Sequence, residues 1–251
     1  MMKILTSRSN PVFVHMKKLG GSKKYRDEQG LFLCDGFKLL KEAINCGVFI
    51  DTVIASQAVE VDLPENTKVY KAKEDLIDSI SPLKNSQGLL FSSRMDKRSD
   101  VDFLTGTHVL LDNIQDPGNV GAIVRCANAF GIKSVILTDK SADLYNPKTI
   151  RGSMGAIFRQ TVLRMNKKEI AVLKKSGVSF IGAVNDDDSI GVNKANLTDT
   201  IIIFGNEGQG ISEMLSELCE NKVKIPLSPE SESINVSTAA AIIMWEAAGR
   251  R

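Results

Sequence analysis

Cysteine and histidine are scarce in this 251-residue sequence, which contains four Cys and two His. The cysteines, Cys34, Cys46, Cys126 and Cys219, are far apart and form no CxxC pair. This pattern argues against a disulfide framework and a structural zinc site, and reduced thiols in a cytoplasm fit it best. With so few histidines a histidine-rich metal site is not expected either, so we predict a protein without a bound metal.

Long apolar segments are also missing. The longest runs, such as residues 201–204, are far too short to cross a bilayer. The segment MMKILTSRSNP has no apolar core followed by a small-residue cleavage site, so we expect no secretory signal. The apolar share of 43% and the charged share of 25% are ordinary for a globular protein. We therefore expect a cytoplasmic protein with no membrane partner, built from one large domain or two small ones.

Positive charge is concentrated near the beginning of the chain, although the net charge is only +2. Residues 1–41 contain nine Lys and Arg against three Asp and Glu, and include the segment KKLGGSKKYR at 17–26. Such a basic segment is an electrostatic indication of nucleic-acid binding. It also fits a solvated surface that binds nothing, and charge alone does not separate the two interpretations.

Residues 1–95 are predicted to form a compact α/β domain, followed by a polar linker at 96–107 with weak periodicity. Residues 11–25 have a helical pattern, and residues 30–47 indicate a strand, a turn and an amphipathic helix. The other predicted elements are strands at 51–56, 67–72 and 88–94 and a helix at 73–81.

From residue 108 to 251 the pattern changes to short, continuous apolar strands that alternate with helices. Such strands are typical of a mostly parallel sheet with both faces covered. In this kind of sheet, ligands bind beyond the carboxyl ends of the strands. The predicted strands are 108–114, 134–139, 160–164, 178–184 and 200–205, and the predicted helices are 120–130, 146–158 and 167–177.

Three loops at strand ends are rich in Gly, Asn, Glu and Ser. In the first, DNIQDPGNVGAIVRCANAFG at 112–131, the apolar residues of the predicted helix form one stripe, and Arg125 lies on the opposite side among Gly and Ala. Small neighbours leave the guanidinium accessible to a phosphodiester or a second chain, although a solvated helix arginine is the usual alternative. Asn119 is expected at the N-cap of this helix, bonded to backbone N–H groups.

The second loop, IIIFGNEGQGIS at 201–212, contains three glycines that permit close backbone approach or a positive φ. Neither the Walker spacing nor GxGxxG occurs here. Glu207 would repel a phosphate and better suits a hydroxyl, an amide or a cation. The alternative is a tight turn before a helix that begins near Ser212.

The third loop lies in IPLSPESESINVSTAAAII at 225–243, between the apolar residues Ile225 and Ile234. Ser233 and Asn235 are two positions apart in an extended segment, so they are predicted to point to the same side. The alternative is simple helix capping by Ser233 or Ser237, which would explain one serine but not the whole SINVS run.

Together these segments resemble the motifs of the SpoU (TrmH-like) branch of the SPOUT RNA methyltransferases. NVGAIVR, FGNEGQGIS and IPLSPESESINVSTAAA match in order and spacing, and IRGSMGAIF also fits. Residues 1–94 resemble, more weakly, the ribosomal-protein-L30e-like substrate-binding domain of the rRNA members, with Asp35 where a glutamate is usual. The resemblance implies a small L30e-like α/β domain followed by a SPOUT α/β-knot domain, a mostly parallel sheet with a deep trefoil knot that forms a homodimer.

The resemblance further implies S-adenosylmethionine (SAM) as cofactor, a ribose 2′-hydroxyl of RNA as methyl acceptor, and no metal. The implied catalytic residues are Asn119, Arg125, Glu207, Ser233 and Asn235, with Arg125 approaching the cofactor of the other subunit. The implied cofactor-binding residues are Gly205, Gly210, Ile225, Leu227, Ile234 and Asn235. The basic N-terminal domain would dock structured RNA, and the candidate contacts are Arg8, Lys17, Lys18, Lys23, Lys24 and Arg26.

The leading hypothesis is a SAM-dependent 2′-O-methyltransferase of 23S rRNA. A tRNA 2′-O-methyltransferase is the alternative within this class, and the L30e-like domain favours rRNA. A non-catalytic RNA-binding or ribosome-assembly factor is the alternative from another class, but such a protein would not need all five site residues. A sugar-phosphate or nucleotide enzyme would rest on the glycines alone and would bind phosphate at 205–210, where Glu207 has the wrong charge.

Overall fold

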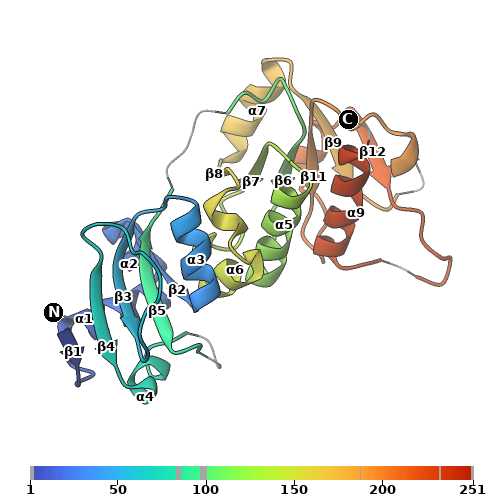
Figure 1. Ribbon diagram of the computed structural model, residues 1–251. Helices are drawn as coiled ribbons and strands as arrows, with labels where there is room; N and C mark the ends of the chain where they lie inside the picture. The colour runs from blue at the N-terminus through green and yellow to red at the C-terminus, as the bar shows by residue number, and fades with distance from the viewer. Residues whose placement is uncertain (1–2, 83–85, 97–100, 187, 232, 250–251) are drawn as a thin grey trace. The chain divides into compact units, whose positions relative to one another are not determined.

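The computed structural model describes residues 3–82, 86–96, 101–186, 188–231 and 233–249. The chain divides into two compact units, Met1–Lys97 with Asp143–Phe158 and Arg98–Ala142 with Arg159–Arg251. Figure 1 shows the course of the chain through both units. In the described part of the chain, no helix has both the length and the apolar character needed to cross a membrane.

The first unit contains a five-stranded sheet in the order β1-β4-β3-β5-β2. Strands β1 (Lys3–Leu5), β4 (Lys68–Ala72) and β3 (Ile50–Ala55) run parallel to one another. Strand β5 (Leu89–Arg94) pairs antiparallel with β3 and with β2 (Leu31–Asp35). Strand β1 was not predicted, because three residues at a sheet edge are too few to display a periodic pattern.

Helices cover both faces of this sheet (Figure 1). Residues of α1 (Pro11–Gly21) and α4 (Glu74–Asp78) pack in one apolar cluster, and residues of α3 (Phe37–Asn45) pack in another. The single helix predicted over 11–25 is in fact two, α1 and α2 (Lys23–Gln29). The break occurs because Ser22 has extended backbone and caps α2 with its side chain.

Residues 143–158 pack with the first unit. This segment contains α6 (Pro147–Ser153) and the short 3₁₀ helix η1 (Ala156–Phe158), and Ile150 and Ile157 belong to the same apolar cluster as α3. One helix was predicted over 146–158, but the chain turns at Met154 and Gly155, which both have positive φ. The predicted domain division at 1–95 and 108–251 stays a prediction, and residues 97–100 of the predicted linker lie outside the described residues.

A buried ion pair connects α2 to this segment. The Arg26 guanidinium pairs with the Asp143 carboxylate, and the side chains are only 4% and 15% exposed. Arg26 also donates to the backbone oxygen of Leu19 at 2.7 Å. This burial corrects the expectation that Arg26 contacts RNA, because its charge is neutralised inside the unit rather than offered at the surface.

Replacing Asp143 by Asn should lower the free energy of unfolding by about 2 kcal/mol, because a charged hydrogen bond is removed and Arg26 stays buried without a counter-charge. Urea unfolding followed by circular dichroism measures the change. The matched control is Lys23→Ala, which removes the exposed Lys23–Asp27 pair and should cost no more than about 0.5 kcal/mol. Equal effects of the two changes would contradict a stabilising role for the buried pair.

The second unit contains a seven-stranded sheet in the order β10-β12-β9-β11-β6-β7-β8, and every pairing in it is parallel. This confirms the predicted parallel sheet. Strands β10 and β12 were not predicted, because they are short and mostly polar. The strands are β6 (His108–Leu111), β7 (Ser134–Leu137), β8 (Val162–Arg164), β9 (Ser179–Ala183), β10 (Ile190–Gly191), β11 (Thr200–Phe204) and β12 (Asn221–Lys224).

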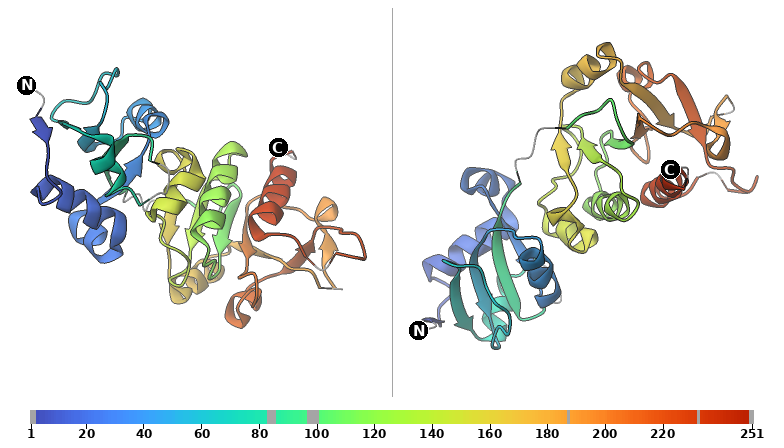
Figure 2. Two further views of the ribbon diagram at one scale, coloured as in Figure 1. Left: turned by 90° about the horizontal axis from the view of Figure 1, so that it is seen from below. Right: turned by 45° about the horizontal axis from the view of Figure 1, so that its top comes forward.

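Both faces of this sheet are covered, as predicted. Helices α5 (Pro117–Ala129) and α9 (Val236–Ala248) pack side by side (Figure 2). Helices α7 (Lys167–Lys175) and α8 (Glu213–Ser216) supply Ile170 and Leu215 to the apolar cluster on the sheet. The short 3₁₀ helix η2 (Val192–Lys194) leads toward β11. Because all strands are parallel, the loops predicted to bear the site leave from one edge.

Candidate active site

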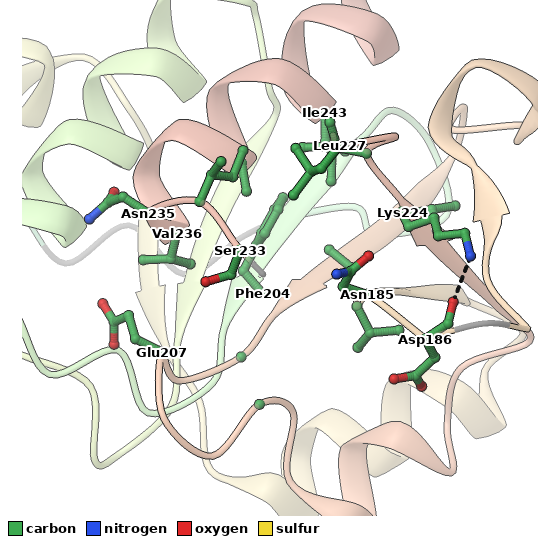
Figure 3. Close-up of a pocket in the computed structure, with 18 of the residues that line it drawn as sticks. Asn185, Asp186, Phe204, Glu207, Lys224, Leu227, Ser233, Asn235, Val236 and Ile243 are labelled. Atoms are coloured by element: carbon green, nitrogen blue, oxygen red, sulfur yellow. Dashed lines mark hydrogen bonds between the residues drawn. The ribbon is translucent and has the colours of Figure 1, made fainter. Parts of the chain in front are cut away.

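A cavity of about 470 Å³ lies at the carboxyl ends of β9, β11 and β12 (Figure 3). Its volume is in the range of small-molecule sites. Apolar side chains such as Phe204, Val236 and Ile243 form much of the wall. All six residues predicted to bind a cofactor line this cavity: Gly205, Gly210, Ile225, Leu227, Ile234 and Asn235.

The loop after β11 closes on itself. Asn206 and Gly210 exchange two backbone hydrogen bonds of 3.0 and 2.8 Å, and the Asn206 side-chain oxygen accepts from the N–H groups of Gly208 at 2.9 Å and Gln209 at 3.1 Å. A Cβ on Gly205 would lie 2.2 Å from the backbone carbon of Gly210, so only glycine fits. The role of Asn206 was not predicted from the sequence, although Asn favours turns of this kind.

A chain of hydrogen bonds joins the three predicted loops. Asn119 donates through Nδ2 to Glu207 Oε1 at 2.6 Å, and Asn235 donates through Nδ2 to Asn119 Oδ1 at 3.1 Å. Asn235 Oδ1 in turn accepts from the Ser237 N–H at 2.8 Å and so caps α9. Ser233, Glu207 and Asn235 gather at one end of the cavity (Figure 3). Four of the five predicted catalytic residues are therefore brought together.

The predicted capping role of Asn119 is wrong, and so is the alternative that Ser233 or Ser237 caps the last helix. The N-cap of α5 is Asp116, not Asn119, and its Oδ1 accepts from the N–H groups of Gly118 at 2.6 Å and Asn119 at 3.0 Å. The helix begins earlier than predicted because Pro117 suits its first position. The cap of α9 is Asn235, so neither Ser233 nor Ser237 serves this purpose. The Asn119 side chain is thus left to bridge Glu207 and Asn235.

Arg125 stands apart from the other four residues. Its side chain is exposed on α5, whereas Val120, Ile123, Val124 and Ala127 are buried, which confirms the predicted orientation of this helix. Arg125 does not line the cavity of its own chain. Among the described residues its side chain has no hydrogen-bond or ion-pair partner, so the guanidinium is available to another molecule.

The opposite end of the cavity contains residues that sequence analysis did not select, namely Asn185, Asp186 and Lys224 (Figure 3). Lys224 Nζ donates to the backbone oxygen of Asp186 at 3.0 Å, and the Asp186 carboxylate pairs with Lys222 at 2.9 Å. The signal available for Asn185 and Asp186 was their position after the predicted strand β9, because ligands bind beyond the carboxyl ends of parallel strands. Lys224 is the last residue of β12, a strand that the sequence did not predict. Because Asp186 is paired with Lys222, it is Glu207 that disfavours a phosphate, at its own end of the cavity.

Potential metal ligands are scattered over the described part of the chain, and the thiols lie away from the cavity wall. Among them, no three His, Cys, Asp or Glu side chains are grouped as metal ligands would be. The four cysteines are free, and none is among the residues that line the cavity. Burial raises the pKa of Cys34 well above its usual range and that of Cys219 to about 11, so both stay protonated at neutral pH.

The predicted RNA contacts on the first unit differ in availability. Lys23 and Lys24 are exposed but face Asp27 and Glu28 at 3.0 and 4.0 Å. Lys18 Nζ lies 5.4 Å from the centroid of the Tyr25 ring. Lys23 and Lys24 are weaker candidates for RNA contacts, because Asp27 and Glu28 offset their positive charge. The candidates that keep their charge at the surface are Arg8, Lys17 and Lys18.

Comparison with known proteins gives two matches along the chain. Residues 106–245 match the SpoU rRNA Methylase family, and residues 10–90 match the MRM3-like substrate binding domain. The first match covers the cavity and all three loops that surround it.

Individual relatives are similar over nearly the full length. The 23S rRNA (guanosine(2553)-2′-O)-methyltransferase RlmP of Bacillus subtilis is 30% identical, and the alignment covers 99% of this chain and all of RlmP. The structure of a TrmH-family protein from Porphyromonas gingivalis has a TM-score of 0.86 at 30% identity, with 98% of this chain and 100% of that chain covered. The AdoMet-bound rRNA methyltransferase from Sinorhizobium meliloti has a TM-score of 0.90 at 26% identity, with 99% and 98% covered. The chain therefore belongs to the SpoU rRNA methylase family.

Proposed function

We propose that this protein is a SAM-dependent methyltransferase that methylates a ribose 2′-hydroxyl in 23S rRNA. The observation that carries the proposal is the hydrogen-bonded chain from Glu207 through Asn119 to Asn235 at the end of the cavity. The B. subtilis relative is a 23S rRNA 2′-O-methyltransferase, which supports the substrate and the position of methylation. The S. meliloti relative binds AdoMet, which supports the cofactor.

The cavity suits the adenosyl part of SAM. Ile225, Leu227 and Ile234 offer apolar contacts, and the tight loop at Gly205 and Gly210 lets backbone groups come close to a ligand. The carboxylate of Glu207 suits a ligand with a positive centre better than a phosphate. Bound there, SAM would supply an electrophilic methyl group with its sulfur as the leaving group, and the proton of the acceptor hydroxyl would pass to solvent.

The side chains of the protein must align the hydroxyl and stabilise the charge that develops on its oxygen. Alignment alone can be worth several orders of magnitude in rate. A guanidinium has no acceptor and a pKa above about 12, so it is a poor base. We therefore assign Arg125 to gripping the adjacent phosphate through two parallel hydrogen bonds and stabilising the oxyanion. Glu207, Asn119 and Asn235 hold the loops in place, and Ser233 faces the same end of the cavity.

The active form is inferred to be a homodimer, in which Arg125 acts at the cavity of the partner. Two observations support this: Arg125 is absent from the wall of its own cavity, and α9 exposes Ile242 and Trp245, which are 37% and 61% exposed. Large exposed apolar side chains on neighbouring turns mark a surface suited to association. We also propose that the second unit contains a trefoil knot. A cytoplasmic location is proposed as well, because free cysteines suit a reducing compartment.

Transfer of radiolabelled methyl from SAM tests the proposal, with total rRNA and total tRNA from cells that lack this gene as separate substrates. Label in rRNA that disappears with Arg125→Ala is the expected result. Label confined to tRNA would replace rRNA by tRNA as substrate. SAM binding without label in either RNA would point to an assembly intermediate as substrate, and absence of SAM binding would favour a non-catalytic RNA-binding factor.

A further inference from the structure

A second hollow lies at the same edge of the parallel sheet, at the carboxyl ends of β6, β7 and β8. It has a volume of about 580 Å³. We call it the lysine groove, and its lining residues are Asn113, Thr138, Asp139, Lys140, Asn166, Lys167 and Lys168. The predicted RNA contacts all lie elsewhere, in residues 8–26, and none of the groove residues belongs to the predicted catalytic or cofactor set.

The groove carries net positive charge, because three lysines face one carboxylate, that of Asp139. Lys140 and Lys168 are exposed, and within the described residues neither ammonium group has a hydrogen-bond or ion-pair partner. Lys168 lies in the first turn of α7, where the partial positive charge of the helix N-terminus adds to the attraction for anions. The chemistry that fits is a row of phosphate groups.

The walls of the groove are held in a fixed shape. Arg164 donates from its guanidinium to the backbone oxygens of Thr138 at 2.9 Å, Asp139 at 3.1 Å and Ala142 at 3.1 Å. Asn166 caps α7 and forms a reciprocal capping box with Glu169. The Arg164 guanidinium is occupied by these backbone oxygens, so the lysines are the cations that remain available to bind a ligand.

The groove is continuous with the loop that bears Glu207. Asn206 donates through Nδ2 to the backbone oxygen of Asn113 at 3.0 Å, and Lys167 Nζ donates to Ser212 Oγ at 2.6 Å. The loop from Gly205 to Ser212 thus borders the cavity on one side and the groove on the other. An RNA strand that places one nucleotide at the Glu207 end of the cavity would bring its neighbouring phosphate groups within reach of the lysines in the groove.

We propose that the lysine groove binds phosphates of the RNA strand next to the nucleotide that is methylated. This inference rests on the proposed function for its choice of RNA as the ligand. Phosphate contacts fix the register of a nucleic acid on a protein without reading its sequence. The groove would therefore position the substrate, and the first unit would supply a separate set of contacts.

The double variant Lys140→Ala/Lys168→Ala tests the proposal in the full-length protein, with fluorescence anisotropy of a labelled polyuridylate oligonucleotide as the readout. We expect its affinity for this RNA to fall about tenfold at physiological salt, and the log–log salt slope to shrink by about 0.7 for each phosphate that the variant no longer neutralises. The matched control is Lys175→Ala/Lys194→Ala, which removes two exposed lysines of the same unit that line neither hollow. The control should retain wild-type affinity and salt slope.

Unchanged RNA affinity in the groove variant, or an equal decrease in both variants, would overturn the proposal. Calorimetric titration with SAM accompanies each measurement, and the groove variant should bind SAM as the wild type does. This separates the two inferences: a wild-type protein that fails to methylate rRNA removes the proposed function, whereas the RNA-affinity comparison continues to decide the groove.

Discussion

Replacement of Arg125 by lysine is expected to lower the rate of methyl transfer by about 10²–10³-fold, the usual cost of removing one donor to a developing oxyanion. Lysine keeps the positive charge but offers a compact ammonium instead of a planar fork, so it cannot grip a phosphate bidentately. SAM affinity should be unchanged, because the role assigned to Arg125 is to grip the phosphate next to the acceptor and not to hold the cofactor. Single-turnover methylation of rRNA and calorimetric titration with SAM measure the two quantities.

Near-wild-type turnover of Arg125→Lys would refute the bidentate role. A parallel decrease in SAM affinity would show that the arginine acts on the cofactor rather than on the acceptor. Arg125→Ala gives the lowest expected rate of methyl transfer, because alanine provides neither the positive charge nor the planar fork. The fold should be unaffected by either change, because the side chain is exposed and without a hydrogen-bond or ion-pair partner in the described part of the chain.

The placement of Arg125 at the partner's cavity has its own test. Arg125→Ala co-expressed with a variant whose cavity is defective should give mixed dimers with one intact composite site, and roughly a quarter of the wild-type activity in a statistical mixture of isologous dimers. Each variant alone should be inactive. Failure of the mixture to regain activity would place Arg125 at the cavity of its own chain or remove the dimer from the mechanism.

Gly205→Ala is expected to destroy the cavity and to supply that defective partner. The added Cβ would lie 2.2 Å from the Gly210 carbon and 2.3 Å from the Ile211 nitrogen. Both are backbone atoms, so no side-chain rotation relieves the clash, and the bridge between Asn206 and Gly210 must open. Overpacking of this kind costs about 1–3 kcal/mol of stability. The displaced loop should lower SAM affinity by about 10²-fold, because each 1.4 kcal/mol of rearrangement that binding must supply costs about tenfold in affinity.

Gly208→Ala is the matched control within the same loop. A Cβ at Gly208 meets only the Asn206 Oδ1, at an ordinary contact distance of 3.6 Å. Its SAM affinity and melting temperature should therefore stay close to those of the wild type. If Gly205→Ala bound SAM as tightly as Gly208→Ala, the close backbone approach at Gly205 would not be a requirement of the site.

The parallel sheet and the location of its ligand edge follow from local sequence patterns. Continuous apolar segments such as 200–204 must be covered on both faces, and this requirement predicts parallel strands with helices between them. The first two polar loops come directly after such strands, whereas the third follows β12, whose polar residues did not predict a strand. All three leave from strands that run parallel, so they gather at one edge. The cofactor candidates line one cavity for this reason.

Contacts between distant residues were not predictable in the same way. Asn119 was expected to cap its own helix, yet its partners are 88 and 116 residues away, in Glu207 and Asn235. A local pattern contains no record of partners at such separation. Arg26 was expected at an RNA surface for the same reason, because its counter-charge Asp143 lies 117 residues further along the chain.

The sequence by itself determined the α/β class, the parallel sheet and the polar loops at one end of the cavity, because backbone hydrogen bonding and apolar burial act over a few neighbouring residues. Only the tertiary structure decided which polar side chains bond to one another. It buried Arg26, used Asp116 instead of Asn119 as a cap, and placed the lysine groove beside the Glu207 loop. These outcomes depend on contacts between segments that are far apart in the chain. A buried or bridging polar group forms its hydrogen bond with the partner that packing places within reach.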